Sequence, residues 1–143
     1  MGFFLSSLRS SFKGKFDLIF SNPPFYDGSL QNPDRRKSGA RHCCDLSFGE
    51  ICSFCSDFLR AEGRFCVILP SDRETSFLRC AASFGLFPFR IIRIRTTADK
   101  KEKRIVMEFC RKRTIPVSEE SLVLQEGSAK SREYCNLTSE FYL

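Results

Sequence analysis

A short stretch near the N-terminus places hydrogen-bond acceptors and an aromatic ring directly after an apolar strand. The apolar run Phe16–Phe20 predicts a buried strand, and Pro23 and Pro24 predict a rigid loop after it. Asn22 offers a side-chain amide, Pro23 a backbone carbonyl, and Phe25 a flat ring face. Ligands of open α/β sheets bind at the carboxyl ends of strands. The spacing therefore suits a planar group that carries an amine, such as a nucleobase.

The same residues also fit a plainer interpretation. Asn initiates turns, and a proline restricts the residue before it, so Asn22, Pro23 and Pro24 are compatible with an ordinary strand-ending turn. The apolar strand before the motif and the aromatic residue after it favour a functional site over a turn.

The charge of the chain predicts a polyanionic partner. The 143 residues carry a net charge of +6, with an isoelectric point near 9.0. A positive surface of this kind suits RNA or DNA, although solvated faces and protected strand edges also use Lys and Arg. The basic residues fall into three groups: Arg35, Arg36, Lys37 and Arg41; Arg90, Arg93 and Arg95; and Lys100, Lys101, Lys103 and Arg104.

Hydropathy and cysteine usage indicate a cytoplasmic protein without a metal. No apolar run approaches the ~20 residues of a membrane span, and Met1–Leu5 lacks the basic leader of a secretory signal. The eight cysteines are therefore expected to be reduced thiols. Cys52 and Cys55 form a CxxC with His42, Cys43 and Cys44 nearby. A structural zinc site usually takes two such pairs, so thiol packing is the better account.

Periodicity predicts alternating strands and helices along the chain. The polar segment 26–44 is long for a compact domain, which is typical of functional loops. Ser47 and Glu50 form a capping box that predicts the start of a helix. The expected helices are a short one over 3–12 and two longer ones over 47–59 and 71–84, which Gly63 and Gly85 end. The expected strands cover 16–21 and 64–70, followed by an antiparallel hairpin of 87–95 with 103–111 and a short strand over 122–125. Residues 134–143 are expected to dock on the fold.

Several segments in order resemble the bacterial tRNA1(Val) adenine-37 N6-methyltransferases, which use S-adenosyl-L-methionine. They are residues 16–25, 40–42, 46–48, 62–70, 95–96, 103–109, 134, 137–138 and 141–143. The resemblance implies an α/β fold: the C-terminal half of a class I methyltransferase (Rossmann-like) doubly wound sheet, with an antiparallel terminal hairpin.

The resemblance also implies roles for individual residues. Asn22, Pro23, Pro24 and Phe25 would form the catalytic loop, in which Asn22 and the Pro23 carbonyl accept hydrogen bonds from the adenine amine and Phe25 stacks on the flipped base. Asn22 would also contact the cofactor. The expected contacts to tRNA are Arg35, Arg36, Lys37, Arg41, His42 and Arg95, with a loop-capping role as the alternative for His42.

One departure from the family pattern stands out. The chain has no glycine-rich cofactor turn, and no strand precedes Phe16. We therefore expect residues 1–143 to form a single partial methyltransferase domain that lacks the N-terminal cofactor-binding half, is inactive in isolation, and self-associates through the exposed strand 16–21. The alternatives are an rRNA guanine-N2 or protein-glutamine methyltransferase, or an inactive RNA-binding or interaction module.

Overall fold

The computed structural model describes residues 11–23 and 40–141, with residues 40–47 described by their backbone alone. The elements follow one another as β1 (Phe16–Ser21), α2 (Ala40–Phe58), β2 (Leu59–Pro70), the 3-10 helix η2 (Ser71–Arg73), α3 (Glu74–Ser83), β3 (Phe87–Arg95), β4 (Arg104–Cys110), β5 (Ser118–Val123), β6 (Gln125–Glu126), β7 (Ala129–Lys130) and α4 (Arg132–Thr138).

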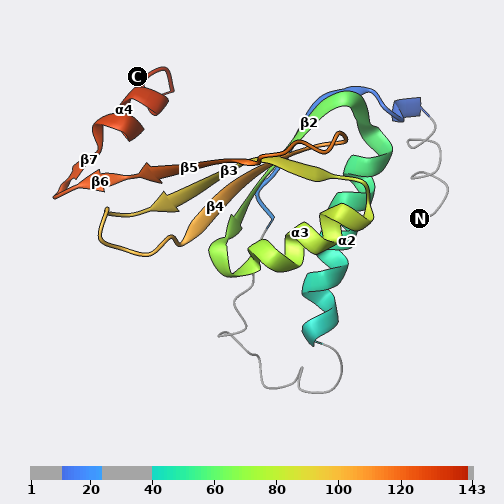
Figure 1. The fold of residues 1–143 in the computed structure, drawn as a ribbon, viewed down its shortest axis with the longest axis horizontal. Coiled ribbons are helices and arrows are strands. Elements are labelled where there is room, and N and C mark those ends of the chain that lie inside the picture. The colour runs from blue at the N-terminus through green and yellow to red at the C-terminus, as the bar shows by residue number, and fades with distance from the viewer. Residues whose placement is uncertain (1–10, 24–39, 142–143) are drawn as a thin grey trace.

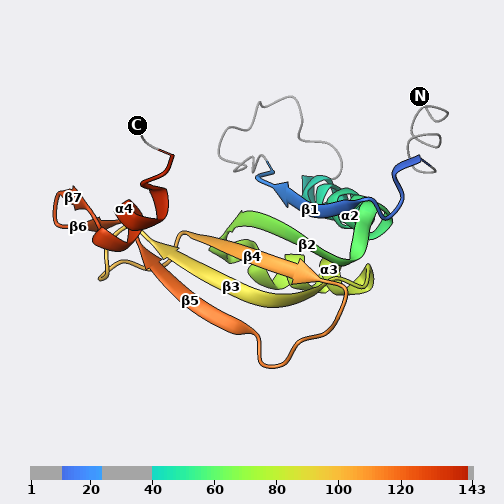
Figure 2. The ribbon, with the colours of Figure 1, turned by 90° about the horizontal axis from the view of Figure 1, so that it is seen from above.

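Five strands form one mixed sheet in the order β1-β2-β4-β3-β5 (Figures 1 and 2). β1 pairs with β2 in parallel and β3 pairs with β5 in parallel, whereas β4 is antiparallel to both of its neighbours. β1, β2, β3 and β5 therefore share one direction, and β4 is the reversed strand between β2 and β3. The predicted hairpin of 87–95 with 103–111 is confirmed.

The core lies between this sheet and the helices α2 and α3, which cover the same face (Figure 1). Alternate side chains of β2 and β4 point into it, as expected for strands with one buried face. Phe77 of α3 packs edge-on against Phe48 of α2, with ring centroids 4.9 Å apart. The fully buried strand residues are Phe65, Val67, Leu69, Ile105, Met107 and Phe109.

The start of α2 differs from the prediction. The helix begins at Ala40, so Ser47 and Glu50 lie inside it and the predicted capping box was wrong. A capping residue must have non-helical backbone angles, which a residue within a continuous helix cannot have. Residues 40–46 contain no Gly or Pro to interrupt the helix. Residues 24–39 of the predicted loop lie outside the described part.

The end of α2 also differs, because β2 begins directly at Leu59. Gly63 does not end the helix; it lies within β2, where the pairing with β1 is irregular. Phe16 pairs with Leu59, but Leu18 pairs with Arg64, so the intervening residues of β2 form a bulge. A Cβ atom at Gly63 would lie 2.8 Å from Leu59 Cδ1 and 3.0 Å from the Phe16 carbonyl oxygen. Close approach therefore explains this glycine.

Arg111 takes over the capping role at the end of α2. Its Nη2 atom donates to the carbonyl oxygen of Ser56 and, at 2.9 Å, to the carbonyl oxygen of Leu59. The carbonyl oxygen of Cys55 lies 3.5 Å from the same Nη2 atom. These carbonyls belong to the last turn of the helix and the residue after it, which have no partner within the helix. A cation at this end also complements the helix dipole.

Ser71 likewise has a different role from the one predicted. It begins η2 and makes no side-chain cap; instead its hydroxyl donates to the Glu102 carbonyl at 2.8 Å. The predicted stop at Gly85 is confirmed, with a positive φ of 71° immediately after the C-cap of α3.

The C-terminal part departs from the prediction in two places. The added strand β5 spans Ser118–Val123, earlier than the predicted 122–125, and pairs with β3. α4 contacts β5, and its N-cap Ser131 is buried and accepts from the Tyr134 amide. However, Leu137 and Phe141 are 63% and 80% exposed, so these two side chains do not dock the segment as expected. Residues 142–143 lie outside the described part.

Candidate functional site

The strands β1, β2, β3 and β5 all end at one side of the sheet, which we term the carboxyl edge (left in Figures 1 and 2). Asn22 is the first residue after β1, and its side chain is exposed at this edge. Pro23 follows it and is buried. The buried proline thus directly follows an exposed carboxamide at the end of β1, and the catalytic role of the two residues stays a prediction. Pro24 and Phe25 lie outside the described residues.

The structure locates only part of the predicted tRNA-contacting set. Arg35, Arg36 and Lys37 lie outside the described residues. Arg41 and His42 belong to the first turn of α2, where the backbone alone is described. Arg95 is the last residue of β3 and therefore lies on the carboxyl edge with Asn22 and Pro23.

Arg95 is only partly engaged in the protein. Its Nη2 lies 3.7 Å from a Glu102 carboxylate oxygen, and its side chain is 37% exposed. Its Nε atom is buried and has no hydrogen-bond partner within the described residues. Glu102 offsets part of the charge, so Arg95 is a weaker anion contact than its position suggests.

The neighbouring arginines hold strands together rather than facing a ligand. Arg93 donates two hydrogen bonds to Glu74, at 2.8 and 3.1 Å, which with a third to Glu119 raise its pKa. Arg90 donates two hydrogen bonds of 2.8 Å to Glu120, which raise the pKa of Arg90. Part of the second basic group seen in the sequence is therefore a set of ion pairs between β3, its neighbours and α3.

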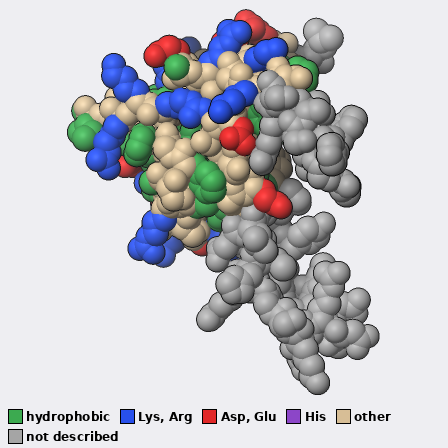
Figure 3. Space-filling view, turned by 90° about the vertical axis from the view of Figure 1, so that its right-hand side faces the viewer, with side chains coloured by type: hydrophobic (Ala, Val, Ile, Leu, Met, Phe, Trp, Pro, Cys, Tyr) green, Lys and Arg blue, Asp and Glu red, His purple; other side chains and the backbone are tan. Residues whose placement is uncertain are grey.

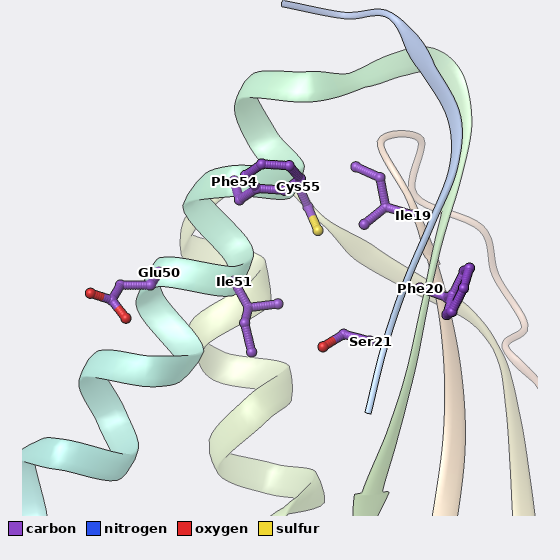
Figure 4. Close-up of a pocket in the computed structure, with 7 residues that line it drawn as sticks. All are labelled: Ile19, Phe20, Ser21, Glu50, Ile51, Phe54 and Cys55. Carbon is purple, nitrogen blue, oxygen red and sulfur yellow. The ribbon is translucent and has the colours of Figure 1, made fainter. Parts of the chain in front are cut away.

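A pocket of about 310 Å³ opens beside the motif, between β1 and α2 (Figure 4). Ile51 and Cys55 of α2 face Ile19 and Ser21 of β1 across it, whereas the Glu50 carboxylate points away. Its lining is Ile19, Phe20, Ser21, Glu50, Ile51, Phe54 and Cys55. The interior is apolar apart from the Ser21 hydroxyl, so it suits an apolar group rather than a charged ligand. Sequence reasoning missed this pocket, because Ile51, Phe54 and Cys55 share the apolar face that the helix pattern assigns to the core.

Cys52 and Cys55 of α2 are packing residues in this structure. Cys52 and Cys55 lie in the helix as predicted, and both are fully buried. Burial raises the pKa of Cys55 to about 12 and raises that of Cys52 as well, so both remain protonated thiols at neutral pH. Within the described residues no group of three or more His, Cys, Asp or Glu is arranged to hold a metal ion.

Nor does any helix in the described ranges have both the length and the hydropathy to cross a membrane.

The chain is similar in sequence to several bacterial proteins described as tRNA1(Val) (adenine(37)-N6)-methyltransferase. It is 36% identical to relatives from Flavobacteriaceae bacterium (strain 3519-10) and Bacteroides fragilis, over 129 residues that make up 90% of the chain and 54% of each relative. It is 35% identical to a relative from Porphyromonas gingivalis over 132 residues, 52% of that protein. No protein-family model matches the chain.

Solved structures of methyltransferases share its fold. A predicted O-methyltransferase from Agrobacterium tumefaciens superposes on 89% of the chain with a TM-score of 0.60 at 13% identity, using 52% of its own length. The cytosine-N4-specific PvuII DNA methyltransferase covers 92% of the chain with a TM-score of 0.56 at 18% identity, using 59% of its length. The five-stranded sheet with its reversed strand is therefore a class I methyltransferase-like fold.

The chain spans about half the length of the curated relatives that it matches. That match covers 90% of the chain, so it takes in most of the sheet and of the two covering helices. By sequence, the chain is thus similar to about half the length of proteins described as tRNA1(Val) (adenine(37)-N6)-methyltransferase, and by fold it is similar to methyltransferases.

Proposed function

We propose that this chain provides the acceptor-binding part of a methyltransferase that transfers a methyl group to the N6 amine of an adenine in tRNA. One observation supports the proposal above the rest: Asn22 stands exposed on a buried proline at the carboxyl end of β1. Ligands of open α/β sheets bind at this position. The names of the relatives supply the substrate class.

In this proposal Asn22 and Pro23 orient the amine. The Asn22 carboxamide oxygen and the Pro23 carbonyl oxygen each accept one of its N–H bonds, which directs the nitrogen lone pair at the methyl group. No strong general base is needed, because the methylated amine is acidic enough to lose its proton. Catalysis then comes mainly from orientation and from fixed dipoles around the reacting nitrogen.

The methyl donor in this proposal is S-adenosyl-L-methionine, which supplies an electrophilic methyl group on sulfur. Among the described residues, Asn22 is the predicted contact, and its exposed carboxamide can hydrogen-bond a polar part of that molecule. The apolar pocket between β1 and α2 has no charged group in its interior, so it is not a site for the charged end of the donor. We propose that residues 1–143 form a partial methyltransferase domain. Most of the donor site then lies in the part of the relatives outside the match, and the chain alone is inactive.

Two further proposals concern the setting of this activity. We propose a cytoplasmic location, where tRNA is modified. We also propose that copies of the chain associate through β1, whose outer edge has no strand partner among the described residues.

A chimaera tests the function. The portion of the Bacteroides fragilis relative that this chain does not match is joined to residues 1–143, and methyl incorporation is measured with tRNA1(Val), bulk rRNA and a glutamine peptide. We expect tRNA to be methylated. We expect Asn22→Ala to slow transfer about a hundredfold or more, because loss of an orienting hydrogen bond costs ~2–4 kcal/mol in the transition state. An exposed residue of this kind should leave the urea midpoint unchanged.

The control is Asn136→Ala, an exposed asparagine of α4. It should leave the transfer rate close to that of the unmodified chimaera. An Asn22→Ala chimaera that is as active as this control would refute the site, and preferential methylation of rRNA or of the glutamine peptide would refute the substrate.

A further inference from the structure

The turn between β3 and β4, residues 96–103, carries an exposed group of cations. Lys100, Lys101 and Lys103 are exposed, as is Arg104 at the start of β4. None of the ion pairs within the described residues involves any of the four. We call these four side chains the basic turn. Their charges are available to a partner in solution, unlike those of Arg90 and Arg93.

The acidic residues of this segment do not cancel the charge. Glu102 lies 3.9 Å from Arg93 and 3.7 Å from Arg95, so its carboxylate is directed at β3. Asp99 is then the one other carboxylate within residues 96–104, compared with the four cations of the basic turn. The segment keeps a surplus of positive charge, which is the electrostatic basis for binding a polyanion.

Backbone and hydroxyl hydrogen bonds fix the turn to the carboxyl edge. The Ser71 hydroxyl donates to the Glu102 carbonyl at 2.8 Å, and the Ser71 amide donates to the Lys103 carbonyl at 3.1 Å. The Lys103 amide in turn donates to the Ile94 carbonyl at 3.2 Å. Ser71 follows the last residue of β2, the strand that pairs with β1. The cations are thus held at the carboxyl end of β2, the strand that pairs with the one from which Asn22 projects.

The distance from the motif to the basic turn matches nucleic acid. β4 is two strands away from β1 in the sheet, about 10 Å at ~4.8 Å per strand, and Arg104 lies three residues, about 10 Å, beyond Met107, the residue of β4 in line with Ser21. The combined separation of ~14 Å is the length of roughly four stacked nucleotides at ~3.4 Å each. A strand of RNA with one base at Asn22 therefore has neighbouring phosphates within reach of lysine side chains on the turn.

Basic residues elsewhere on the molecule provide a control for the effect of total charge on binding. Figure 3 looks from the opposite side, where Lys and Arg also gather. Lys13 and Lys15 precede β1, and Lys112 and Arg113 follow the reversed strand β4, so all four lie at the far end of the sheet from Asn22. They form no ion pair in the described structure and thus give a control set of equal charge.

We propose that the basic turn binds the phosphates next to the target nucleotide and so directs tRNA to the carboxyl edge. The proposal rests on the proposed function, since it takes the acceptor to be RNA. It adds a contact surface from the C-terminal hairpin, apart from the basic residues of segment 35–41.

The test compares two variants of the 143-residue chain. One replaces Lys100, Lys101, Lys103 and Arg104 by Gln; the other replaces Lys13, Lys15, Lys112 and Arg113 by Gln. Both lose four charges, and urea unfolding checks that both are folded. Binding of bulk tRNA is measured by fluorescence anisotropy without a methyl donor, at about 50 to 200 mM salt, the range over which phosphate contacts weaken strongly. Poly-glutamate serves as a second polyanion.

We expect the turn variant to bind tRNA at least ~10-fold more weakly, with a salt slope smaller by ~1.5–3, because each phosphate contact contributes ~0.7–0.9. The control variant should lose less than ~3-fold. Equal losses in both variants would overturn the proposal, and so would equal affinity of the unmodified chain for poly-glutamate. Because no methyl transfer is measured, failure of this test is distinct from failure of the Asn22 experiment.

Discussion

Gly63 is a position with little room for a side chain. A Cβ atom there would lie within 3.0 Å of both the Leu59 side chain and the carbonyl oxygen of Phe16. We predict that Gly63→Ala lowers the free energy of unfolding by about 1–3 kcal/mol, because an inserted methyl group must displace a buried leucine and the backbone of β1. Urea unfolding followed by circular dichroism measures the change.

Gly49 in α2 is the matched control. Apart from its chain neighbours and the backbone of the helix itself, no atom of the described residues lies within 4 Å of a Cβ atom there. Gly49→Ala should raise the free energy of unfolding by about 0.5–1 kcal/mol, because Ala is the better helix former. Opposite signs for the same substitution are the expected result; a neutral Gly63→Ala would mean that the bulge in β2 opens without cost.

At the scale of elements, the end of α2 depends on a side chain that directly follows β4. We predict that Arg111→Gln destabilises the chain by about 1.5–3 kcal/mol, since the carbonyls at the end of α2 lose charged hydrogen bonds. Lys112→Gln next to it should change the stability by less than ~0.5 kcal/mol, because this side chain is exposed. A difference of less than ~0.5 kcal/mol between the two variants in thermal or urea unfolding would contradict the capping role.

β5 should have a pH-dependent attachment to β3. Hydrogen bonds from Arg90 lower the folded-state pKa of Glu120. A lowered pKa contributes stability above the unfolded value near 4.5, and this contribution is lost as the pH falls through the folded value. We therefore predict that Glu120→Gln is less stable than the unmodified chain at pH 7 and that the difference in urea midpoints shrinks below about pH 4.5. A constant difference from neutral to acidic pH would exclude the pair as its source.

The elements show what local patterns can and cannot predict. Alternation in 87–95 and 103–111 gave the hairpin; the alternate residues of β4 form a buried face, whereas β3 buries Ile91 and leaves its other side chains partly exposed. The strand before Asn22 was also predictable, but the expectation that it is buried was wrong: Leu18 and Phe20 of β1 are 59% and 79% exposed, because burial depends on what packs against a strand and not on its own apolar residues. The C-terminal end of α2 was not, because Arg111, which caps it, is 52 residues from Leu59 along the chain. Likewise Ser71 has the residue type of a cap, but its hydroxyl binds a carbonyl 31 residues later, and a sequence window cannot contain both.

At the scale of the whole molecule, β1 is an edge strand of the sheet that exposes apolar side chains. Its one strand partner among the described residues is β2, and Leu18 and Phe20 are 59% and 79% exposed. Open strand edges with apolar side chains recruit other strands. We predict that the chain self-associates and that Leu18→Lys with Phe20→Lys makes it a monomer in multi-angle light scattering. Leu137→Lys with Phe141→Lys, an equally exposed pair near the C-terminus, should leave the association unchanged.

The parallel pairing of β1 with β2 also implies a delay during synthesis between the appearance of one strand and that of its partner. β1 leaves the ribosome ahead of β2 by the time needed to add residues 22–58, which separate the two strands. At ~5–20 residues per second this interval is roughly 2–8 seconds. During this interval β1, with Phe16, Leu18 and Phe20, has no partner strand. A chaperone that binds short apolar segments therefore has access to these residues. The β3–β4 hairpin, joined by a short turn, has no comparable wait.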